Sequence, residues 1–469
     1  MCMLSGVILQ QLSTLKKVMT MQRMTSILAT SWMQFSGTLL ILWMLPSCRY
    51  GAAINVEDNR YYQPANAQTL WYLQSADQHE SKNPWMEYYL PLGNGHLGAM
   101  LSGGIDKDVI QLNEKTLWDG SDRTYGDYQN LGFLYIEDLS PSDVTDYHFA
   151  LNLQTAVAET EWESAGKGGH IRREYLCSWP ARCLVIHQTA TRPTGFQQRI
   201  SLEGTHGETI SYSGNCIVMQ TMLESIVAST VVQVRVNDGA GIQATQNGLT
   251  VSNAREMTVV LTAETNYQPS VMGYVNRSYD TMKAAQQRIA NAGTCGWQAL
   301  RDEHVRDYQR LFQRVSFTLD NAHCERPTDE LVMGAESATA NELCFLQQLY
   351  FDYGRYLHIA ASRDGAVPSN LQGIWCNTNT PPWHCAIVSD INVEMNYWAA
   401  EPTNLAETTA PLLNYVYTGA MEQPFWHDYA RKMTNVTQGW LCSFACTPLG
   451  HCDPWYPHHV CCATPAWFC

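Results

Sequence analysis

Charged residues are scarce in this sequence, and basic residues are the minority among them. Only 16% of the 469 residues are charged, and 29 Lys and Arg stand against 44 Asp and Glu, a net charge of -15. Proteins that bind polyanions normally carry the opposite sign, so nucleic acid is not an expected partner. A content of 45% hydrophobic and 11% aromatic residues excludes a mainly disordered chain. The 15 Trp and 24 Tyr fit a surface that binds neutral polymers such as glycans.

Long hydrophobic runs are also missing. A membrane-spanning helix needs about 20 apolar residues, and the apolar run Leu39–Leu45 is too short. Three basic residues precede this run and small residues follow it, which predicts an export signal over residues 1–53. A signal that began at Met21 or Met24 would have an ordinary length. We therefore also expect that translation begins at one of these methionines and that Met1 is a spurious start. The exported protein is periplasmic, cell-surface or secreted, and a lipid anchor at Cys48 is an alternative.

Regular Cys-x2-Cys pairs are absent, although the chain has 16 cysteines. Six of them lie in the last 28 residues: Cys442, Cys446, Cys452, Cys461, Cys462 and Cys469. A Cys/His metal site with His451, His458 and His459 is one interpretation, but the spacing does not support it. The other interpretation is a segment read out of frame. We therefore expect an anomalous tail over 441–469, no metal and no cofactor.

The period of the hydrophobic residues changes along the chain. Up to about residue 270, short runs rich in Val, Ile and Thr alternate with turn residues, as in Val109–Leu112, Cys183–Gln188, Ile217–Met222 and Met257–Thr262. This spacing predicts an antiparallel β-sandwich over 69–272. No sustained helical period occurs in this part.

Helical spacing begins near residue 280. Met282–Ala292 and Trp297–Arg314 predict a helical linker over 280–330. Glu342–Ser362 is apolar nearly all round and is expected to be buried. A helical hairpin broken at Pro402 is expected from Asn392 to about Tyr417, within a helical domain over 340–440. The fold class is therefore multidomain, β first and α second.

Asn, Gln, Asp and Trp crowd between Gly354 and Glu407, in loops at the starts of predicted helices. Planar amides bridge sugar hydroxyls, and indole rings cover the apolar face of a pyranose. Asn and Asp at helix starts often only cap the backbone, which is the plainer interpretation of each residue alone. Three Trp and several amides within about 30 residues exceed what capping needs, so we expect a sugar site.

Seven motifs in order resemble glycoside hydrolase family 95, the inverting α-L-fucosidases: Pro91–Met100, Gln111–Gly120, His304–Phe312, Gly354–Tyr356, Asn370–Trp375, Pro381–Trp383 and Asn392–Trp398. The resemblance covers residues from about 69 to 440. It implies an N-terminal β-super-sandwich, a helical linker and an (α/α)6 barrel. It also implies hydrolysis of a terminal α-L-fucose, commonly α1,2-linked, in a fucosylated oligosaccharide or glycan.

The family's Asn-x-Asn pair, which holds the attacking water, corresponds to Asp390 and Asn392. Asp390 stands where the family has Asn, so it is expected to assist the water, to act as the base or only to cap the helix. The resemblance implies Gln372, Trp375 and Trp383 as substrate-binding residues. Asn113 and Glu114, from the sandwich, are expected to close the same pocket.

The family's general acid, a Glu, lies well over 100 residues beyond the Asn-x-Asn pair, whereas this chain has 469 − 392 = 77 residues after Asn392. Glu394 would lie about 200° around the helix from Asn392, and Glu401 about 14 Å along it, so neither replaces the acid. We therefore expect a C-terminally truncated barrel and an inactive chain. A non-catalytic glycan-binding remnant and a related inverting phosphorylase are the alternatives.

Overall fold

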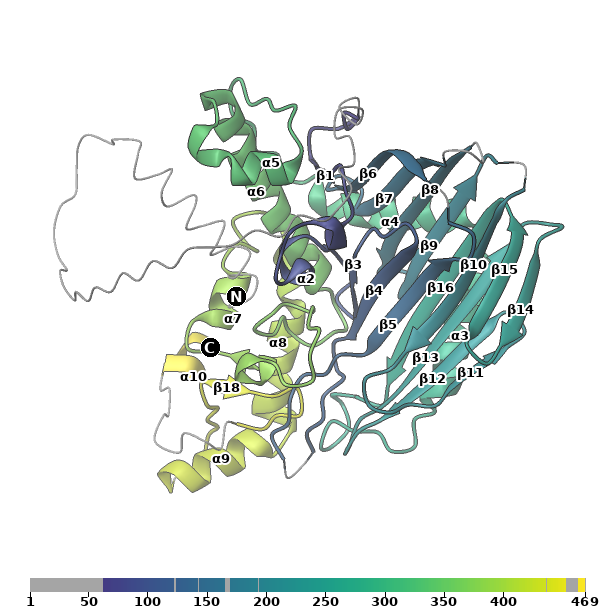
Figure 1. The fold of residues 1–469 in the computed structure, drawn as a ribbon. Coiled ribbons are helices and arrows are strands. Elements are labelled where there is room, and N and C mark those ends of the chain that lie inside the picture. The colour runs from purple at the N-terminus through teal and green to yellow at the C-terminus, as the bar shows by residue number, and fades with distance from the viewer. Residues whose placement is uncertain are drawn as a thin grey trace, which may run out of the picture.

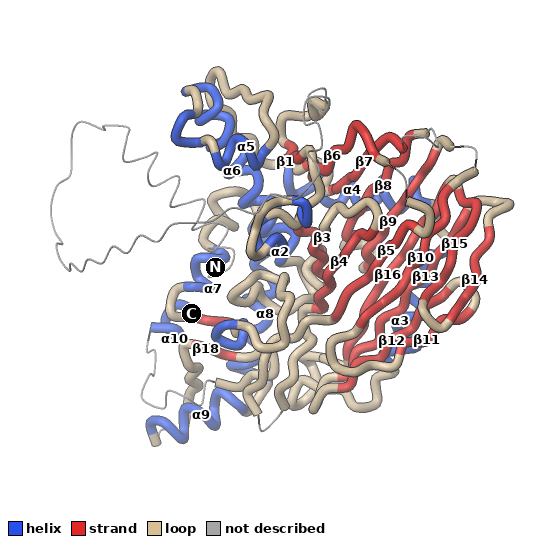
Figure 2. The backbone as a smooth tube through the Cα atoms, in the orientation of Figure 1, coloured by secondary structure: helices blue, strands red, loops and turns tan. Residues whose placement is uncertain are grey.

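The computed structural model describes residues 62–121, 124–141, 143–164, 169–192, 194–435, 437–452 and 463–468. The predicted export signal, the alternative starts and Cys48 lie outside these residues. Strands fill one side of the molecule and helices the other (Figures 1 and 2). The expected order, β first and α second, is therefore confirmed. The domain boundaries stay predictions.

Among the described residues between 69 and 265, sixteen strands form two antiparallel sheets. The nine-stranded sheet has the order β1 (Thr69–Tyr72), β6 (Val144–Asn152), β7 (Val157–Ser164), β8 (His170–Ser178), β9 (Cys183–Ala190), β16 (Glu256–Thr265), β13 (Val227–Val236), β12 (Cys216–Met222) and β11 (Ile210–Ser213). The seven-stranded sheet has the order β14 (Gly241–Thr245), β15 (Gly248–Ala254), β10 (Phe196–Glu203), β5 (Gly132–Asp138), β4 (Lys107–Glu114), β3 (Leu97–Leu101) and β2 (Leu90–Gly93). The four strands predicted by name in the sequence are all present.

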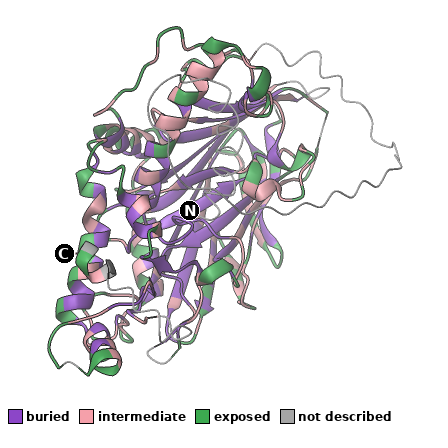
Figure 3. Ribbon diagram, turned by 90° about the vertical axis from the view of Figure 1, so that its left-hand side faces the viewer, coloured by how far each residue is buried: buried purple, intermediate pink, exposed green. Residues whose placement is uncertain are grey.

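Burial along the strands explains the two-sheet arrangement. In β10 and β5, buried residues alternate with more exposed ones, as expected for strands with one covered face. β9 and β16 are buried along most of their length instead. Their outer face is covered by α3 (Thr281–Gly293), where Ile289 and Ala285 pack in one cluster with Val185 and Val260. Purple strands run through the interior in Figure 3.

The helices expected after residue 280 are present. α4 spans Trp297–Phe312, and Tyr308 on it donates a hydrogen bond to the Leu153 carbonyl. α3 and α4 both pack on the sandwich, and their predicted role as a linker between domains stays a prediction. α2 (Pro84–Glu87) and α5 (Thr328–Met333) are short.

The helical part begins with α6 (Ala340–Ala361) and continues through α7 (Asn392–Tyr397), α8 (Ala410–Tyr417), α9 (Phe425–Thr434) and α10 (Ala463–Phe468). The expectation that the first of these helices is buried is wrong for its N-terminal half, because Leu343, Phe345 and Leu346 are only half-buried. No helix among the described residues is long and apolar enough to cross a membrane. The (α/α)6 barrel stays a prediction.

The described part of the cysteine-rich segment is integrated into the fold. β18 (Ala445–Cys446) pairs antiparallel with β17 (Ile387–Val388), and Cys442 and Cys446 pack in a cluster with Trp426. Cys446 Sγ lies 3.7 Å from Cys452 Sγ. His458 and His459, which the metal interpretation needs, lie outside the described residues.

Candidate functional site

The segment after α6 follows the boundary between the sandwich and the helices. Trp375 donates its indole N–H to the Leu92 carbonyl at 2.8 Å, and the Cys376 N–H donates to Asn113 Oδ1 at 2.9 Å. Asn113 Nδ2 in turn donates to the Cys376 carbonyl at 2.9 Å. Asn113 is fully buried, so its amide holds this loop in place. Its expected part in closing a sugar pocket stays a prediction.

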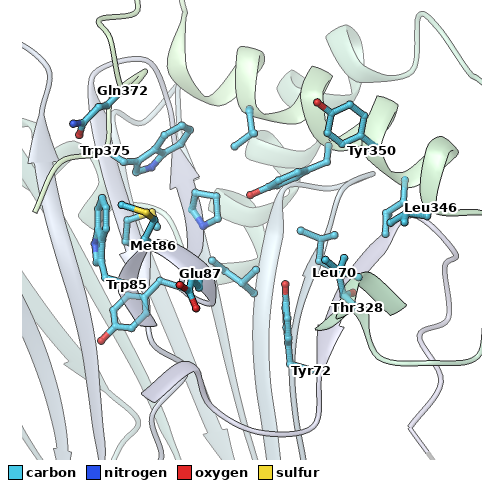
Figure 4. Close-up of a pocket in the computed structure, with 18 residues that line it drawn as sticks. Leu70, Tyr72, Trp85, Met86, Glu87, Thr328, Leu346, Tyr350, Gln372 and Trp375 are labelled. Atoms are coloured by element: carbon cyan, nitrogen blue, oxygen red, sulfur yellow. The ribbon is translucent and has the colours of Figure 1, made fainter. Parts of the chain in front are cut away.

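Gln372 and Trp375 line one cavity, of about 110 Å³, between the sandwich and α6 (Figure 4). Most of its wall is aromatic or aliphatic: Leu70, Tyr72, Trp85, Tyr89, Leu346, Tyr350 and Tyr353. The Oε1 atom of Gln372 is buried and has no hydrogen-bond partner among the described residues. An apolar wall with one unsatisfied amide acceptor suits a ligand that offers a hydroxyl donor.

Trp383 lies on an exceptional loop. Three consecutive residues, Trp383, His384 and Cys385, have positive φ angles of 49°, 58° and 51°, a left-handed conformation that non-glycine residues rarely adopt. The loop is tied to the sandwich because His384 Nδ1 lies 2.9 Å from Asp127 Oδ1. Trp383 itself is 64% exposed. A strained, anchored loop that presents an indole to solvent is a functional candidate, and no sequence signal identified Asp127 or His384.

Asp390 and Asn392 flank the start of α7, a helix that begins because Glu394 caps it. Glu394 Oε2 accepts a hydrogen bond from the Ile391 N–H at 3.2 Å, and Ile391 has φ 117°. Asp390 is exposed and makes no capping hydrogen bond, so the plain helix-cap interpretation of Asp390 is wrong. Neither the Asp390 carboxylate nor the Asn392 amide has a hydrogen-bond partner among the described residues. Both are therefore free to bind a ligand or a water.

The two glutamates near this pair differ in environment. Glu394 is 4% exposed, and burial together with the nearby Asp390 charge raises the pKa of its carboxyl. Its carboxylate accepts a hydrogen bond from the Ile391 N–H at the start of α7, and the expected turn of Glu394 away from Asn392 stays a prediction. Glu401 is exposed and lies beyond the end of α7 at Tyr397. The expected axial separation does not apply to Glu401, because the helix has ended before it.

Glu114 lines a different cavity from Gln372 and Trp375. It is 5% exposed, and burial raises the pKa of its carboxyl to about 7. Its Oε2 atom accepts hydrogen bonds from the N–H and the hydroxyl of Thr116, both at 2.7 Å. This second cavity has a volume of about 300 Å³. Gln372 and Trp375 thus line one cavity and Glu114 lines the other, and the roles of all seven expected site residues stay predictions.

One group of three possible metal ligands occurs in the described part of the chain. Ligand atoms of His148, Glu159 and Glu161 lie within 4.8 Å of one another. Arg172 forms ion pairs at 2.7 Å with each glutamate, through Nη2 and Nε. The guanidinium already supplies the positive charge between these carboxylates, so we assign no ion to them.

Comparison with known proteins agrees with this architecture. Residues 296–469 match the glycosyl hydrolase family 95 catalytic domain, and residues 70–127 and 121–270 match the glycosyl hydrolase family 65 N-terminal domain. The first match runs through the cysteine-rich segment. Among solved structures, "Putative kojibiose phosphorylase from human microbiome" superimposes with a TM-score of 0.53 at 11% identity, over 77% of this chain and 50% of that one. That likeness shows the fold alone.

Two curated relatives are named as fucosidases. "Probable alpha-fucosidase A" of Aspergillus niger is 27% identical over 84% of this chain and 57% of its own length. "Alpha-L-fucosidase 2" of Arabidopsis thaliana is 28% identical over 75% of this chain and 48% of its own length. The chain thus spans about half the length of these relatives. The catalytic-domain match and these two likenesses thus point to the same family that the sequence motifs resemble, glycoside hydrolase family 95.

Proposed function

We propose that this protein is a glycoside hydrolase of α-L-fucosidase type that removes terminal, α1,2-linked L-fucose from oligosaccharides with inversion. The catalytic-domain match and the names of the relatives support the substrate. The observation that carries the site is the pair of unbonded side chains at the start of α7, Asp390 and Asn392. We also propose that the protein is exported and meets its glycan outside the cytoplasm.

Inversion needs two groups on opposite faces of the sugar, an acid on the leaving oxygen and a base behind the attacking water. Asn392 positions the water through its amide, and Asp390 accepts the proton or assists Asn392. Asp390 is exposed at the start of α7, so its carboxylate can be reached by the attacking water. Trp383, on its strained loop, offers an indole face for the ring of the glycan.

We assign the general acid to neither of the two glutamates near the pair. Glu394 is held by the Ile391 N–H, and Glu401 lies past the end of α7. General acid catalysis typically contributes about 10²- to 10⁴-fold to a rate. We therefore propose that these 469 residues recognise fucosides but cleave natural glycosides very slowly.

A glycan-binding protein without catalysis is the second candidate. The exposed indoles of Trp383 and Trp398, at 64% and 53%, favour it, as does the aromatic cavity around Trp375. A phosphorylase activity is the third, and it differs from hydrolysis by its requirement for inorganic phosphate.

Saturation-transfer NMR with 2'-fucosyllactose tests recognition. The full chain should saturate the fucose protons, and Asn392→Ala should reduce the signal several-fold, because one direct amide hydrogen bond is lost. Asn341→Ala, an exposed asparagine on α6, is the matched control and should leave the signal unchanged. Equal signals from all three proteins would remove Asn392 from the site, and phosphate-dependent formation of fucose 1-phosphate in place of free fucose would assign the phosphorylase reaction.

A further inference from the structure

The cavity that contains Glu114 has a mixed lining of charged and aromatic residues. It lies between the sandwich, the loop after α6 and α8, and its volume is about 300 Å³. Asp390, Asn392, Gln372 and Trp375 are not among its lining residues. Its volume lies at the lower end of the range of ligand pockets, and it corresponds to roughly ten water molecules. A monosaccharide-sized ligand therefore fits it.

The Arg182 guanidinium is the unpaired cation of this cavity. Arg182 lies in the turn between β8 and β9, and no described residue forms a close ion pair or a hydrogen bond with its guanidinium, although the carboxylates of Glu264, Glu114 and Asp364 attract it from farther away. The neighbouring Arg288, on α3, is already paired with Glu264 on β16. Gly365, with φ +77°, leaves space for Arg182, because a Cβ at this glycine would lie 3.0 Å from Nη2.

Two further polar atoms at the cavity wall make no hydrogen bond of good geometry in the described structure. The Tyr274 side chain is fully buried, yet its hydroxyl makes no hydrogen bond. The Nε2 atom of His96 is also buried and makes no hydrogen bond of good geometry, although its ring lies close enough to the Asp364 backbone for that contact to raise its pKa. Glu114 uses Oε2 for both bonds from Thr116, so Oε1 stays available. Leaving buried polar groups unsatisfied is costly, which indicates that something else completes them.

We propose that this cavity is a second binding site, for a small carboxylate that also bears hydroxyl groups, as a uronic acid does. The planar guanidinium of Arg182 matches a carboxylate in a two-pronged hydrogen bond. Tyr274, His96 and Glu114 supply the mixed donors and acceptors that ring hydroxyls need. The protein's net charge of -15 disfavours anions at its surface in general, so an unpaired arginine in a cavity provides a local exception.

Charge in the cavity depends on pH through Glu114. Burial raises the pKa of Glu114 to about 7, while burial together with the charges of Arg182 and Lys115 lowers that of His96 to about 3. The remaining facing or neighbouring groups are the pair Arg288–Glu264, Asp364, Lys115 and three tyrosines, Tyr267, Tyr274 and Tyr279. Above pH 7 the ionised Glu114 competes with a bound anion for Arg182, so anion affinity should fall.

Isothermal titration of the full chain at pH 6 with sodium D-glucuronate, D-glucose and sodium acetate tests the site. Glucuronate should bind at least tenfold more tightly than glucose or acetate, because only it offers both a carboxylate and hydroxyls. Arg182→Gln should weaken glucuronate binding at least tenfold. Arg199→Gln, at an arginine on β10 paired with Glu137, is the matched control and should not change it.

The Glu114→Gln variant tests the pH dependence of binding in a protein that should still bind glucuronate, so a folding defect cannot explain its result. The wild-type protein should bind glucuronate several-fold more weakly at pH 8 than at pH 6, whereas Glu114→Gln should bind equally at both. Equal affinity for glucose and glucuronate, unaffected by Arg182→Gln, would identify a neutral-sugar site and overturn the proposal. Absence of binding by all three probes to the folded wild-type protein would also overturn it.

Discussion

One ion pair, between Asp108 on β4 and Arg173 on β8, is completely removed from solvent. The two side chains are both 0% exposed and approach to 2.8 Å, and Tyr175 donates its hydroxyl to the same carboxylate at 2.6 Å. The pair joins strands of the two different sheets. Its energetic role is therefore to fix how the sheets face each other.

We expect Asp108→Asn to lower the free energy of unfolding by about 3 to 5 kcal/mol, because it leaves the Arg173 charge buried without a counter-charge. Urea denaturation followed by tryptophan fluorescence measures this value. Lys107→Ala, next in the chain, removes a half-exposed pair with Glu137 and should cost about 1 kcal/mol or less. Similar losses in the two variants would contradict the account of the buried pair.

The carboxyl of Glu114 makes stability depend on pH. Its pKa rises from the ordinary 4.5 to about 7 on folding, so the folded state holds more protons between these values, and stability falls as pH rises through them. We compare the free energy of unfolding of Glu114→Gln with that of the wild-type protein. This difference should shift in favour of the variant by about 3 kcal/mol from pH 4 to pH 8. Unfolding curves of both proteins at each pH would reveal it, and a constant difference would contradict the buried carboxyl.

Individual side chains were the hardest feature to predict from sequence. The Leu-Asn-Glu run on β4 suggested that Asn113 and Glu114 act together. In a strand, however, successive side chains point to opposite faces. Asn113 consequently binds the loop at Cys376, while Glu114 faces the second cavity. The positive φ angles at Trp383 and Ile391 had no sequence signal, because no glycine marks them.

At the scale of elements, α3 shows what the hydrophobic period does and does not reveal. The period predicted the helix within one or two residues but described it as a linker. The period gives the buried face of a helix and not the surface that this face covers. In the structure the buried face lies on β13 and β16, in a cluster with Val231 and Val260.

The packing of α3 can be measured by truncating Ile289, which is 3% exposed. We expect Ile289→Ala to lower the free energy of unfolding by about 2 to 5 kcal/mol through lost burial and the cavity left behind. Met333→Ala, at a methionine 78% exposed at the end of α5, should change it by less than about 0.5 kcal/mol. A linker that merely crosses the surface would make the two changes alike.

At the scale of the whole molecule, the order of a β-sandwich followed by helices was predictable because the hydrophobic period changes once, near residue 280. The pairing of β17 with β18 was not predictable from the sequence. It joins residues 387–388 to residues 445–446 through strands of only two residues each. The same contact brings the cysteine-rich segment into the fold. Composition alone set this segment apart, but its buried cysteines pack as ordinary small apolar residues.

Buried histidines should make the molecule sensitive to acid. Burial lowers the pKa of His79, His187, His304 and His358 to about 4 and that of His96 to about 3. The unfolded chain therefore binds more protons than the folded one between these values and 6.5, and stability is lost as pH falls through that range. We expect a loss on the order of several kcal/mol between pH 7 and pH 4, measured by urea denaturation. Unchanged stability would contradict the burial of these side chains.

Hydrolysis of α-L-fucosyl fluoride tests the central claim most directly. Fluoride leaves without a proton from a general acid, so Asp390 and Asn392 should suffice for it if they activate the water as we propose. We expect the 469-residue chain to release fluoride above the buffer rate, Asn392→Ala and Asp390→Asn to reduce this release at least tenfold, and 2'-fucosyllactose to stay intact. Rapid cleavage of 2'-fucosyllactose by this chain, or fluoride release that is indifferent to both substitutions, would contradict the account.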